Sequence, residues 1–287
     1  MDVIRSADEL RATTDTSRAA GCDVGLVPTM GALHEGHLSL IRRAREQRDA
    51  VVVSVFVNPR QFADPTDLER YPRDETRDLT LCDELGVDAV WAPTVAEVYP
   101  PGIHLPQPDP GPVGAAFEGA SRPGHFEGVL AVVHRLFDVT GPCAAYFGEK
   151  DAQQLFLVRR MVEIERLPVE LVECPTVREP DGLALSSRNA GLSPEERDQA
   201  GCLFLALTEA AAMARAGERD ANVLVAAMAR EIGATPLARL DHAAVVDART
   251  FERVVALDPG AAARALVAAT FPSVRLIDNL RLPIEDR

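Results

Sequence analysis

The sequence has few cysteines, and none of them are paired at the spacing of metal ligands. Its five cysteines are odd in number and widely spaced, and no two form a Cys-x-x-Cys motif. A disulfide framework needs paired cysteines and a cysteine zinc site needs closely spaced ones, so neither is expected. We expect most of the five thiols to behave as small, buried apolar side chains.

The sequence also lacks a long apolar run. Its longest strongly apolar stretch, AVVVSVFV at residues 50–57, is far shorter than the roughly 20 residues that a membrane-spanning helix needs. The N-terminal segment MDVIRSADELRA carries scattered charges and has no uninterrupted apolar region, so it is not expected to be a signal peptide. These absences predict a cytoplasmic protein that does not bind a membrane.

Positive charge is in the minority. The 30 Lys and Arg residues face 44 Asp and Glu residues, which gives a formal net charge of −14. A surface of this sign disfavours broad, nonspecific binding to a phosphate backbone, so no nucleic-acid partner is expected. A local basic pocket for a small anion is still compatible with this charge. The basic residues that lie near particular motifs therefore matter more than the total.

Apolar runs alternate with amphipathic segments over the first part of the chain, which is long enough for two domains. Buried strands are predicted at residues 24–28, 51–57, 87–93, 143–148 and 169–175. Helices are predicted at residues 38–49, 73–86, 128–141 and 151–166. This order indicates an α/β fold with a Rossmann-like, doubly wound parallel sheet. Ligands of such sheets bind at the carboxyl ends of the strands, so the loops after the strands at 24–28, 51–57 and 144–147 should converge.

The pattern changes after residue 176. Ser193, Pro194 and Glu196 form a capping-box start for a helix that should end at Gly217, and a second helix is predicted at about residues 219–232. Strand-like runs follow at residues 240–248, 265–271 and 274–280. We predict a nucleotide-binding and catalytic domain at residues 1–176. A smaller C-terminal α+β domain at residues 177–287 should act as a lid.

His34 and His37 stand three residues apart, just after a predicted strand and a glycine-containing turn. Zinc peptidases place two helical histidines four residues apart, and no third ligand follows here, so a metal site is disfavoured. One alternative is that one histidine caps a turn while the other lies on the surface. The favoured alternative is an anion site, where both imidazoles assist the positive end of a helix dipole.

Two further polar segments follow predicted strands. Asn58 and Gln61 come after the strand at 51–57, although an Asn-Pro turn would also explain them. Gly148 permits close approach of the backbone, and Lys150 is a compact charge that suits phosphate. Asp151 is equally suited to capping the next helix.

Two loops also carry candidate groups. Ser186, Ser187 and Arg188 bring two hydroxyls and a guanidinium together, although the same residues would suit a solvated linker. Arg122 and His125 lie among glycines in a segment that alone reads as a flexible surface loop. As part of a lid, Arg122 would neutralise an anionic substrate.

Taken in order, these segments resemble the pantoate–β-alanine ligase (pantothenate synthetase) family, in the nucleotidylyltransferase group related to class I aminoacyl-tRNA synthetases. PTMGALHEGH resembles the family's HIGH-type motif, and LSSRN resembles its counterpart of the KMSKS loop. The resemblance extends over essentially the whole chain. The other matching segments, in family order, are FVNPRQF, YPR, RPGHFEGV, YFGEKDAQQL and PTVREPDGLALSSRN.

The resemblance implies an ATP-dependent condensation of (R)-pantoate with β-alanine. A pantoyl adenylate would form first, and the products would be pantothenate, AMP and pyrophosphate, in coenzyme A biosynthesis. The resemblance also implies Mg²⁺ bound with ATP, and a homodimer whose ligands are small molecules.

The family's pattern assigns roles to particular side chains. The catalytic residues would be His34, His37, Lys150, Ser186, Ser187 and Arg188. These residues would also bind ATP, together with Met30, Gly31, Gly148, Asp151, Val177 and Leu185. Pantoate and β-alanine would be held by Asn58, Gln61, Arg122, His125 and Gln154.

Four positions depart from this pattern. Leu185 stands where methionine is common, Ala152 replaces a frequent tyrosine, and Arg60 a frequent methionine or leucine. Arg77 stands where some relatives have an acidic residue proposed to contact metal. The sequence therefore assigns no protein ligand to Mg²⁺.

Two other functions share part of the pattern. A nucleotidyltransferase that keeps the nucleotidyl group on its product would share the histidine and serine motifs, but not the Gln61 and Gln154 pair. A non-catalytic nucleotide sensor would have little need of every phosphate contact.

Overall fold

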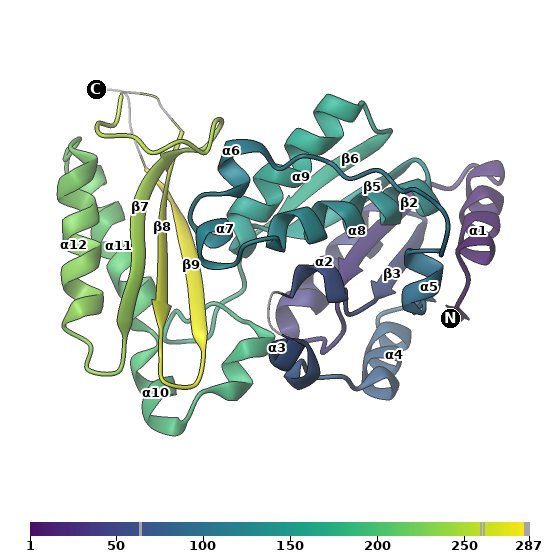
Figure 1. The fold of residues 1–287 in the computed structure, drawn as a ribbon, viewed down its shortest axis with the longest axis horizontal. Coiled ribbons are helices and arrows are strands. Elements are labelled where there is room, and N and C mark those ends of the chain that lie inside the picture. Colours follow the sequence, from purple (N-terminus) through teal and green to yellow (C-terminus); the bar gives the residue numbers. More distant parts are fainter. Residues whose placement is uncertain (63–64, 259, 261, 284–287) are drawn as a thin grey trace. The chain divides into compact units, whose positions relative to one another are not determined.

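The computed structural model describes residues 1–62, 65–258, 260 and 262–283. The chain divides into two compact units (Figure 1). The first unit consists of Met1–Glu149 with Gln153–Pro175, and the second of Lys150–Ala152 with Thr176–Arg287. The short segment at Lys150 thus groups with the C-terminal part of the chain.

The first unit is built on a parallel sheet of six strands in the order β1-β4-β3-β2-β5-β6. The strands are β1 (Asp2–Ile4), β2 (Val24–Thr29), β3 (Ala50–Val55), β4 (Ala89–Trp91), β5 (Cys143–Gly148) and β6 (Val169–Cys174). The longer helices are α1 (Ala7–Ala19), α2 (Glu35–Gln47), α4 (Glu75–Glu84), α8 (His125–Thr140) and α9 (Ala152–Glu165). Shorter ones are η1 (Pro59–Gln61), α3 (Pro65–Arg70), α5 (Val95–Val98), α6 (Gly111–Gly114) and α7 (Glu118–Ser121). The short helix η2 (Glu149–Asp151) runs into the segment that groups with the second unit.

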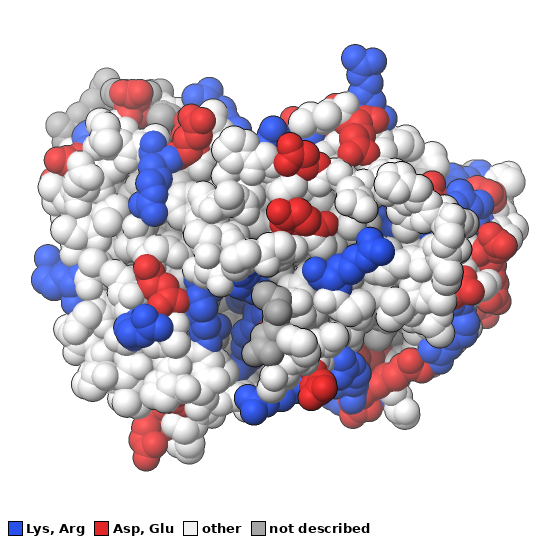
Figure 2. Space-filling view, in the orientation of Figure 1, with Lys and Arg blue, Asp and Glu red and all other residues white. Residues whose placement is uncertain are grey.

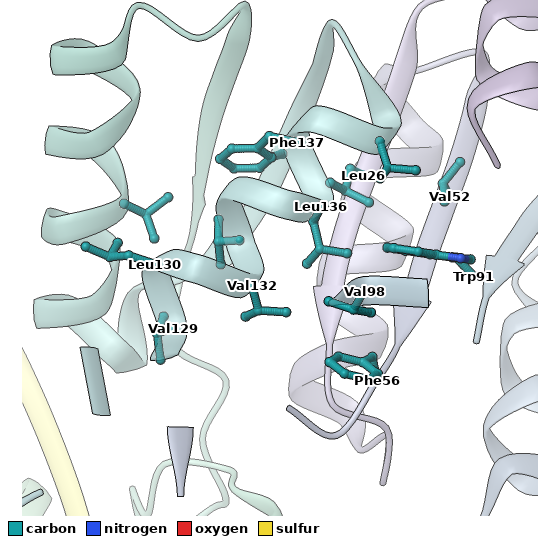
Figure 3. Packing of buried hydrophobic residues seen from close by; sticks show 14 of the residues in the cluster. Leu26, Val52, Phe56, Trp91, Val98, Val129, Leu130, Val132, Leu136 and Phe137 are labelled. Carbon is teal, nitrogen blue, oxygen red and sulfur yellow. The ribbon is translucent and has the colours of Figure 1, made fainter. Parts of the chain in front are cut away.

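Both faces of this sheet are covered, which explains why its strands are apolar at nearly every position. Successive side chains of a strand point to opposite faces. Leu26 of β2 accordingly belongs to a core with α1, α8 and α9, and Val27 to a second core with α2 and α4. Figure 3 shows the first core, where Leu136 of α8 lies near Leu26 and Trp91.

The strand order reverses direction beside β2. From β2 the chain proceeds through β3 to β4 on one side of the sheet, while β5 and β6 lie on the other side. Crevices of doubly wound sheets open at this kind of switch point, at the carboxyl ends of the strands. The turns that follow β3, β2 and β5 therefore leave three neighbouring strands at the same edge of the sheet, as the sequence predicts.

The second unit contains an antiparallel sheet in the order β7-β8-β9, packed against two helices. Its strands are β7 (Arg239–Asp247), β8 (Ala263–Thr270) and β9 (Arg275–Leu282), and its helices are η3 (Ser187–Gly191), α10 (Pro194–Gln199), α11 (Cys202–Arg215) and α12 (Ala221–Gly233). Small side chains of α11, including Ala206 and Ala210, are fully buried and let this helix lie close to the sheet.

The structure confirms the predicted α/β fold and differs in several elements. The sequence patterns do not predict β1 or α1, because β1 has only three residues and α1 buries only Ala7, Leu10 and Thr14. The helix predicted to run to Gly217 is divided into α10 and α11 by a turn at Ala200 and Gly201. Glycine is a poor helix former, which fits a break at this point.

The composition is reflected in the structure. All five cysteines lie among the described residues and are free thiols, three of them buried. Within the described part of the chain, no helix combines the length and apolar character needed to cross a membrane. Acidic and basic side chains are interspersed on the face that Figure 2 shows.

A core substitution tests this packing. Leu130 of α8 is 1% exposed, whereas Ile164 of α9 is 65% exposed. Leu130→Ala should lower the free energy of unfolding by about 2–5 kcal/mol, because it leaves a cavity in a filled core. Ile164→Ala should change it by less than about 0.5 kcal/mol. Trp91 is the only tryptophan and is fully buried, so its fluorescence in a urea titration reports unfolding of the first unit. Equal losses in the two variants would contradict the described core.

Candidate active site

The turn that follows β2 is held from its first residue. The Thr29 hydroxyl donates to the carbonyl of Ser54 at 2.6 Å and accepts the N–H of Gly31 at 3.1 Å. Gly31 has a φ of +77°, and a Cβ atom at this position would lie 2.8 Å from a carboxylate oxygen of Asp78. Only glycine fits both the left-handed backbone and this close approach.

His34 and His37 cap the N-terminus of α2 reciprocally. His34 is the N-cap residue, and its Nδ1 accepts the N–H of Gly36 at 3.2 Å. The N–H of His34 in turn donates to Nδ1 of His37 at 3.4 Å. The two rings are stacked at a tilt, with their centroids 4.1 Å apart. Two of the backbone donors at the helix start are thereby satisfied by imidazole nitrogens.

This arrangement determines the tautomer of both rings. A backbone N–H is always a donor, so each Nδ1 that it meets must be an acceptor. In a neutral imidazole the other nitrogen then carries the proton, which makes Nε2 of both residues a hydrogen-bond donor. Capping and anion binding, which the sequence presents as alternatives, are compatible because they use different nitrogens of the same rings.

Asn58 and Gln61 form a buried polar cluster after β3. The Asn58 amide donates to the Gln61 side chain at 3.2 Å and to the carbonyl of Gly128 at 2.9 Å. Gln61 Nε2 lies 2.7 Å from the sulfur of Met30, so this cluster reaches the turn that precedes His34. Asn58 is 1% exposed and Gln61 is 7% exposed, and buried amides of this kind are held in one orientation by their partners.

Arg122 and His125 contact each other and the backbone of Gln61. The Arg122 guanidinium lies 3.1 Å from His125 Nε2 and donates to the Gln61 carbonyl at 3.3 Å. Nδ1 of His125 lies 2.9 Å from the same carbonyl oxygen. Gly128, one turn further into α8, makes this approach feasible, because a Cβ there would lie 2.2 Å from the Arg60 carbonyl oxygen.

Tyr99 is a member of this cluster that the sequence motifs do not indicate. Its hydroxyl donates to Asn58 Oδ1 at 2.9 Å, and Arg60 lies over its ring at 3.8 Å. Burial raises the pKa of Tyr99 to about 12, so the phenol stays protonated and remains a donor at neutral pH. Arg60, one of the departures from the family's pattern, thus has a cation–π partner.

Two sequence-predicted residues lie at the end of β5 and the start of α9. Gly148 is the last residue of β5, and Gln154 is half-buried in the first turn of α9. The structure gives no hydrogen bond between Gln154 and the Asn58 cluster among the described residues. Its neighbour Gln153 is buried and holds the segment around α6 and α7, through the carbonyls of Val113 and Ala116.

Lys150 belongs to the second unit and is the only lysine of the chain. Its ammonium lies 3.8 Å from the carboxylate of Asp151, and its side chain is 17% exposed. The carbonyl of Lys150 accepts the Asn279 amide of β9 at 2.8 Å, and the Arg264 guanidinium donates to the other end of this amide. Asn279 is not part of any motif that the sequence indicates, because the contact spans more than a hundred residues.

The serine-containing segment is ordered by backbone hydrogen bonds within the second unit. The N–H of Leu185 donates to the carbonyl of Val177 at 3.0 Å, which places these two predicted adenine neighbours opposite each other. The Ser186 hydroxyl accepts the N–H of Arg188 at 3.3 Å and caps η3, on which Ser187 and Arg188 lie half-buried.

A buried ion pair connects this segment to β9. Arg178, next to Val177, makes hydrogen bonds of 2.6 and 3.0 Å to the two oxygens of Asp278 and lies over the Phe204 ring. Burial raises the pKa of the Asp278 carboxyl, against the opposing effect of the Arg178 charge. The pair thereby joins the segment at Val177 and Arg178 to Asp278, the residue that precedes Asn279.

The described residues do not provide a metal site of their own. No group of three or more His, Cys, Asp or Glu side chains suitable for a metal ion occurs among them. Asp78, whose carboxylate contacts the turn before His34, uses both oxygens to accept the N–H groups of Ala32 and Leu33.

A family model and a curated relative match this chain over nearly its full length and indicate the same family. The family model described as "Pantoate-beta-alanine ligase" matches residues 2–281. A pantothenate synthetase of Rubrobacter xylanophilus is 52% identical, and the match covers 98% of each chain.

Two solved structures support the same grouping. A pantothenate synthetase from Thermus thermophilus is 48% identical with a TM-score of 0.91, over 98% of this chain and 99% of that one. A pantoate-beta-alanine ligase from Francisella tularensis, complexed with "Beta-gamma ATP" and β-alanine, is 32% identical with a TM-score of 0.78. That match covers 98% of this chain and 97% of the other.

Proposed function

The chain belongs to the pantoate–β-alanine ligase family, and from this premise we propose how its residues act in the reaction. It is an AMP-forming carbon–nitrogen ligase that condenses (R)-pantoate with β-alanine, using ATP, to give pantothenate. The family match over residues 2–281 is the observation that carries this function.

The reaction proceeds in two displacements. An oxygen of the pantoate carboxylate attacks the α-phosphorus of ATP, the bond to the bridging oxygen breaks, and pyrophosphate leaves. The amine of β-alanine then attacks the carbonyl carbon of the pantoyl adenylate. AMP leaves as the carbon–oxygen bond breaks, and the amine loses a proton. Neither displacement needs a covalent enzyme intermediate, so the protein contributes positioning and charge stabilisation.

His34 and His37 are proposed to stabilise the ATP phosphates during the first displacement. Their Nδ1 atoms cap α2, and the resulting Nε2–H donors lie at the positive end of the helix dipole. Donors that are already oriented before the substrate binds need no reorganisation when negative charge moves to the leaving pyrophosphate. Met30 and Gly31 are proposed to line the same ATP site.

Residues of the second unit are proposed to meet further phosphate charge. Lys150 provides a compact ammonium, and Arg188 a guanidinium whose segment is fixed by the Ser186 cap. Ser186 and Ser187 supply hydroxyl donors. Gly148 and Asp151 are proposed to lie near the ribose, and Val177 and Leu185 beside the adenine.

Pantoate and β-alanine are proposed to bind at the Asn58 cluster. Gln61 and Gln154 would hold pantoate, and Asn58 with Gln61 would lie near β-alanine. Support comes from the buried hydrogen bonds that fix both amides. Arg122 and His125 are proposed as members of the same pocket, and their contacts to the Gln61 carbonyl would keep that residue oriented.

Mg²⁺ is proposed to enter with ATP as part of the substrate, since the chain offers no ligand set of its own among the described residues. Chelation should therefore abolish pyrophosphate release, and added Mg²⁺ should restore it in proportion to the MgATP formed. The measurement is a titration of activity with Mg²⁺ at fixed ATP. Full activity after exhaustive chelation would contradict this proposal.

The assembly is proposed to be a homodimer in the cytoplasm, as the family's pattern implies. Sedimentation velocity would show a species of twice the chain mass, and a monomer at micromolar concentration would contradict it.

A product assay tests the function against its two rivals. With ATP and pantoate alone, one equivalent of pyrophosphate per active site should appear, and β-alanine should then release AMP and pantothenate. A stable adenylylated product that β-alanine does not consume would indicate a nucleotidyltransferase instead. Nucleotide binding without any pyrophosphate release would indicate a sensor.

Substitutions of His34 and Lys150 test the site. His34→Ala and Lys150→Ala should each slow adenylate formation by roughly 10²–10³-fold, as loss of a single transition-state donor does elsewhere. Lys150→Arg keeps the charge but not the compact ammonium, so it should restore little of the rate. His104→Ala, at an exposed histidine of the first unit, is the matched control and should leave the rate unchanged. Near-normal single-turnover rates in both alanine variants would refute the assignment.

A further inference from the structure

The turn between β2 and α2 contains an alanine in a backbone conformation that alanine does not favour. Gly31 and Ala32 are consecutive residues with φ values of +77° and +50°. The left-handed region is unfavourable by roughly 1–2 kcal/mol for a residue with a Cβ atom, so Ala32 stays there only if its surroundings hold it. This turn immediately precedes the N-cap histidine.

Asp78 of α4 holds this turn. Its Oδ2 accepts the N–H of Ala32 and its Oδ1 accepts the N–H of Leu33, both at 2.8 Å. Arg77, the preceding residue of the same helix, donates to the carbonyl of Leu33 at 3.0 Å. Two consecutive residues of the helix thus form hydrogen bonds with three backbone groups of the turn.

The burial of Asp78 makes these contacts strong. The residue is only 1% exposed, and hydrogen bonds to a charged acceptor are about twice as strong as neutral ones. Removing a carboxylate from water costs free energy, which its two hydrogen bonds to backbone amides offset. Moving either amide away would leave the buried charge without that donor, so the turn is held in place. The pKa of the neighbouring Cys82 thiol is raised to about 12, mainly by the burial of that thiol and to a smaller extent by the negative charge of Asp78.

The position of this turn determines the positions of His34 and His37. Leu33 is 1% exposed and packs in the core beneath α2, and its peptide bond leads directly into His34. Rotation of the backbone at Ala32 or Leu33 would tilt the start of α2. The two Nδ1 contacts that orient the rings would then be lost.

We propose that Asp78, assisted by Arg77, is a positioning residue for His34 and His37. It acts on the first displacement, in which pantoate is adenylylated, by keeping the two Nε2–H donors aimed at the phosphates. The effect on catalysis rests on the proposed function. The effect on the turn does not.

Asp78→Asn is the variant that tests this role. The amide keeps one acceptor oxygen, but its NH₂ group meets a backbone N–H that it cannot accept. Asp74→Asn is the matched control, because Asp74 is the exposed N-cap of the same helix and asparagine caps equally well. Trp91 fluorescence verifies that both variants are folded.

The readout separates the two displacements. In Asp78→Asn, pyrophosphate release from ATP and pantoate should fall by roughly 10- to 100-fold, as misplaced groups do elsewhere. Conversion of added pantoyl adenylate by β-alanine should change far less, and Asp74→Asn should resemble the unsubstituted protein in both. Equal losses in the two steps, or no loss, would overturn the proposal.

Two further measurements keep the proposal testable. If Asp78→Asn does not fold, Arg77→Ala removes only an exposed side chain and should show a smaller loss confined to the first step; equal losses or none would count against it. If the unsubstituted protein releases no pyrophosphate, the proposed function has failed. The imidazole ¹⁵N signals of His34 and His37 then decide the role of Asp78. These signals should shift in Asp78→Asn and not in Asp74→Asn; if Asp78→Asn does not fold, Arg77→Ala takes its place. Unchanged signals would refute the proposed role of Asp78.

Discussion

The reciprocal contact between His34 and His37 is the interaction on which the rest of the site depends. Each Nδ1 accepts a backbone N–H at the start of α2, so each ring is held in one orientation and one tautomer. The same nitrogens that complete the helix therefore determine that the opposite nitrogens donate. A helix N-terminus already favours an anion, and here two further donors are built into its cap.

Other residues of the first unit keep this cap in place. Thr29 and Asp78 hold the turn before it, and Met30 connects the turn to the buried amides of Asn58 and Gln61. In the second unit, the Lys150 backbone is bound by Asn279, a strand residue far away in the sequence. The backbone before His34 and the backbone of Lys150, two residues that we propose to bind phosphate, are thus each fixed within their own unit. Their side chains keep the polar ends that the chemistry needs.

Much of the fold, and some residues of the candidate site, could be predicted from the sequence. Apolar runs such as 51–57 identify β3 because a strand covered on both faces must be apolar throughout. His34, Asn58 and Lys150 are identified as candidates because they follow predicted strands. Asp78, Tyr99 and Asn279 are not, because their roles come from contacts between segments distant in sequence. Asp78 in particular looks like an ordinary acidic residue near a helix start, and only the positive φ of Ala32 reveals what it holds.

The tautomer of the two histidines tests the central claim most directly. Long-range ¹⁵N–¹H correlation of the histidine-labelled, ligand-free protein distinguishes a protonated from an unprotonated ring nitrogen, and single substitutions assign the six histidines. At a pH where the rings are neutral, His34 and His37 should both carry the proton on Nε2 and leave Nδ1 unprotonated. A proton on Nδ1 of either residue would contradict the account, because that nitrogen could not then accept the backbone N–H that orients the ring.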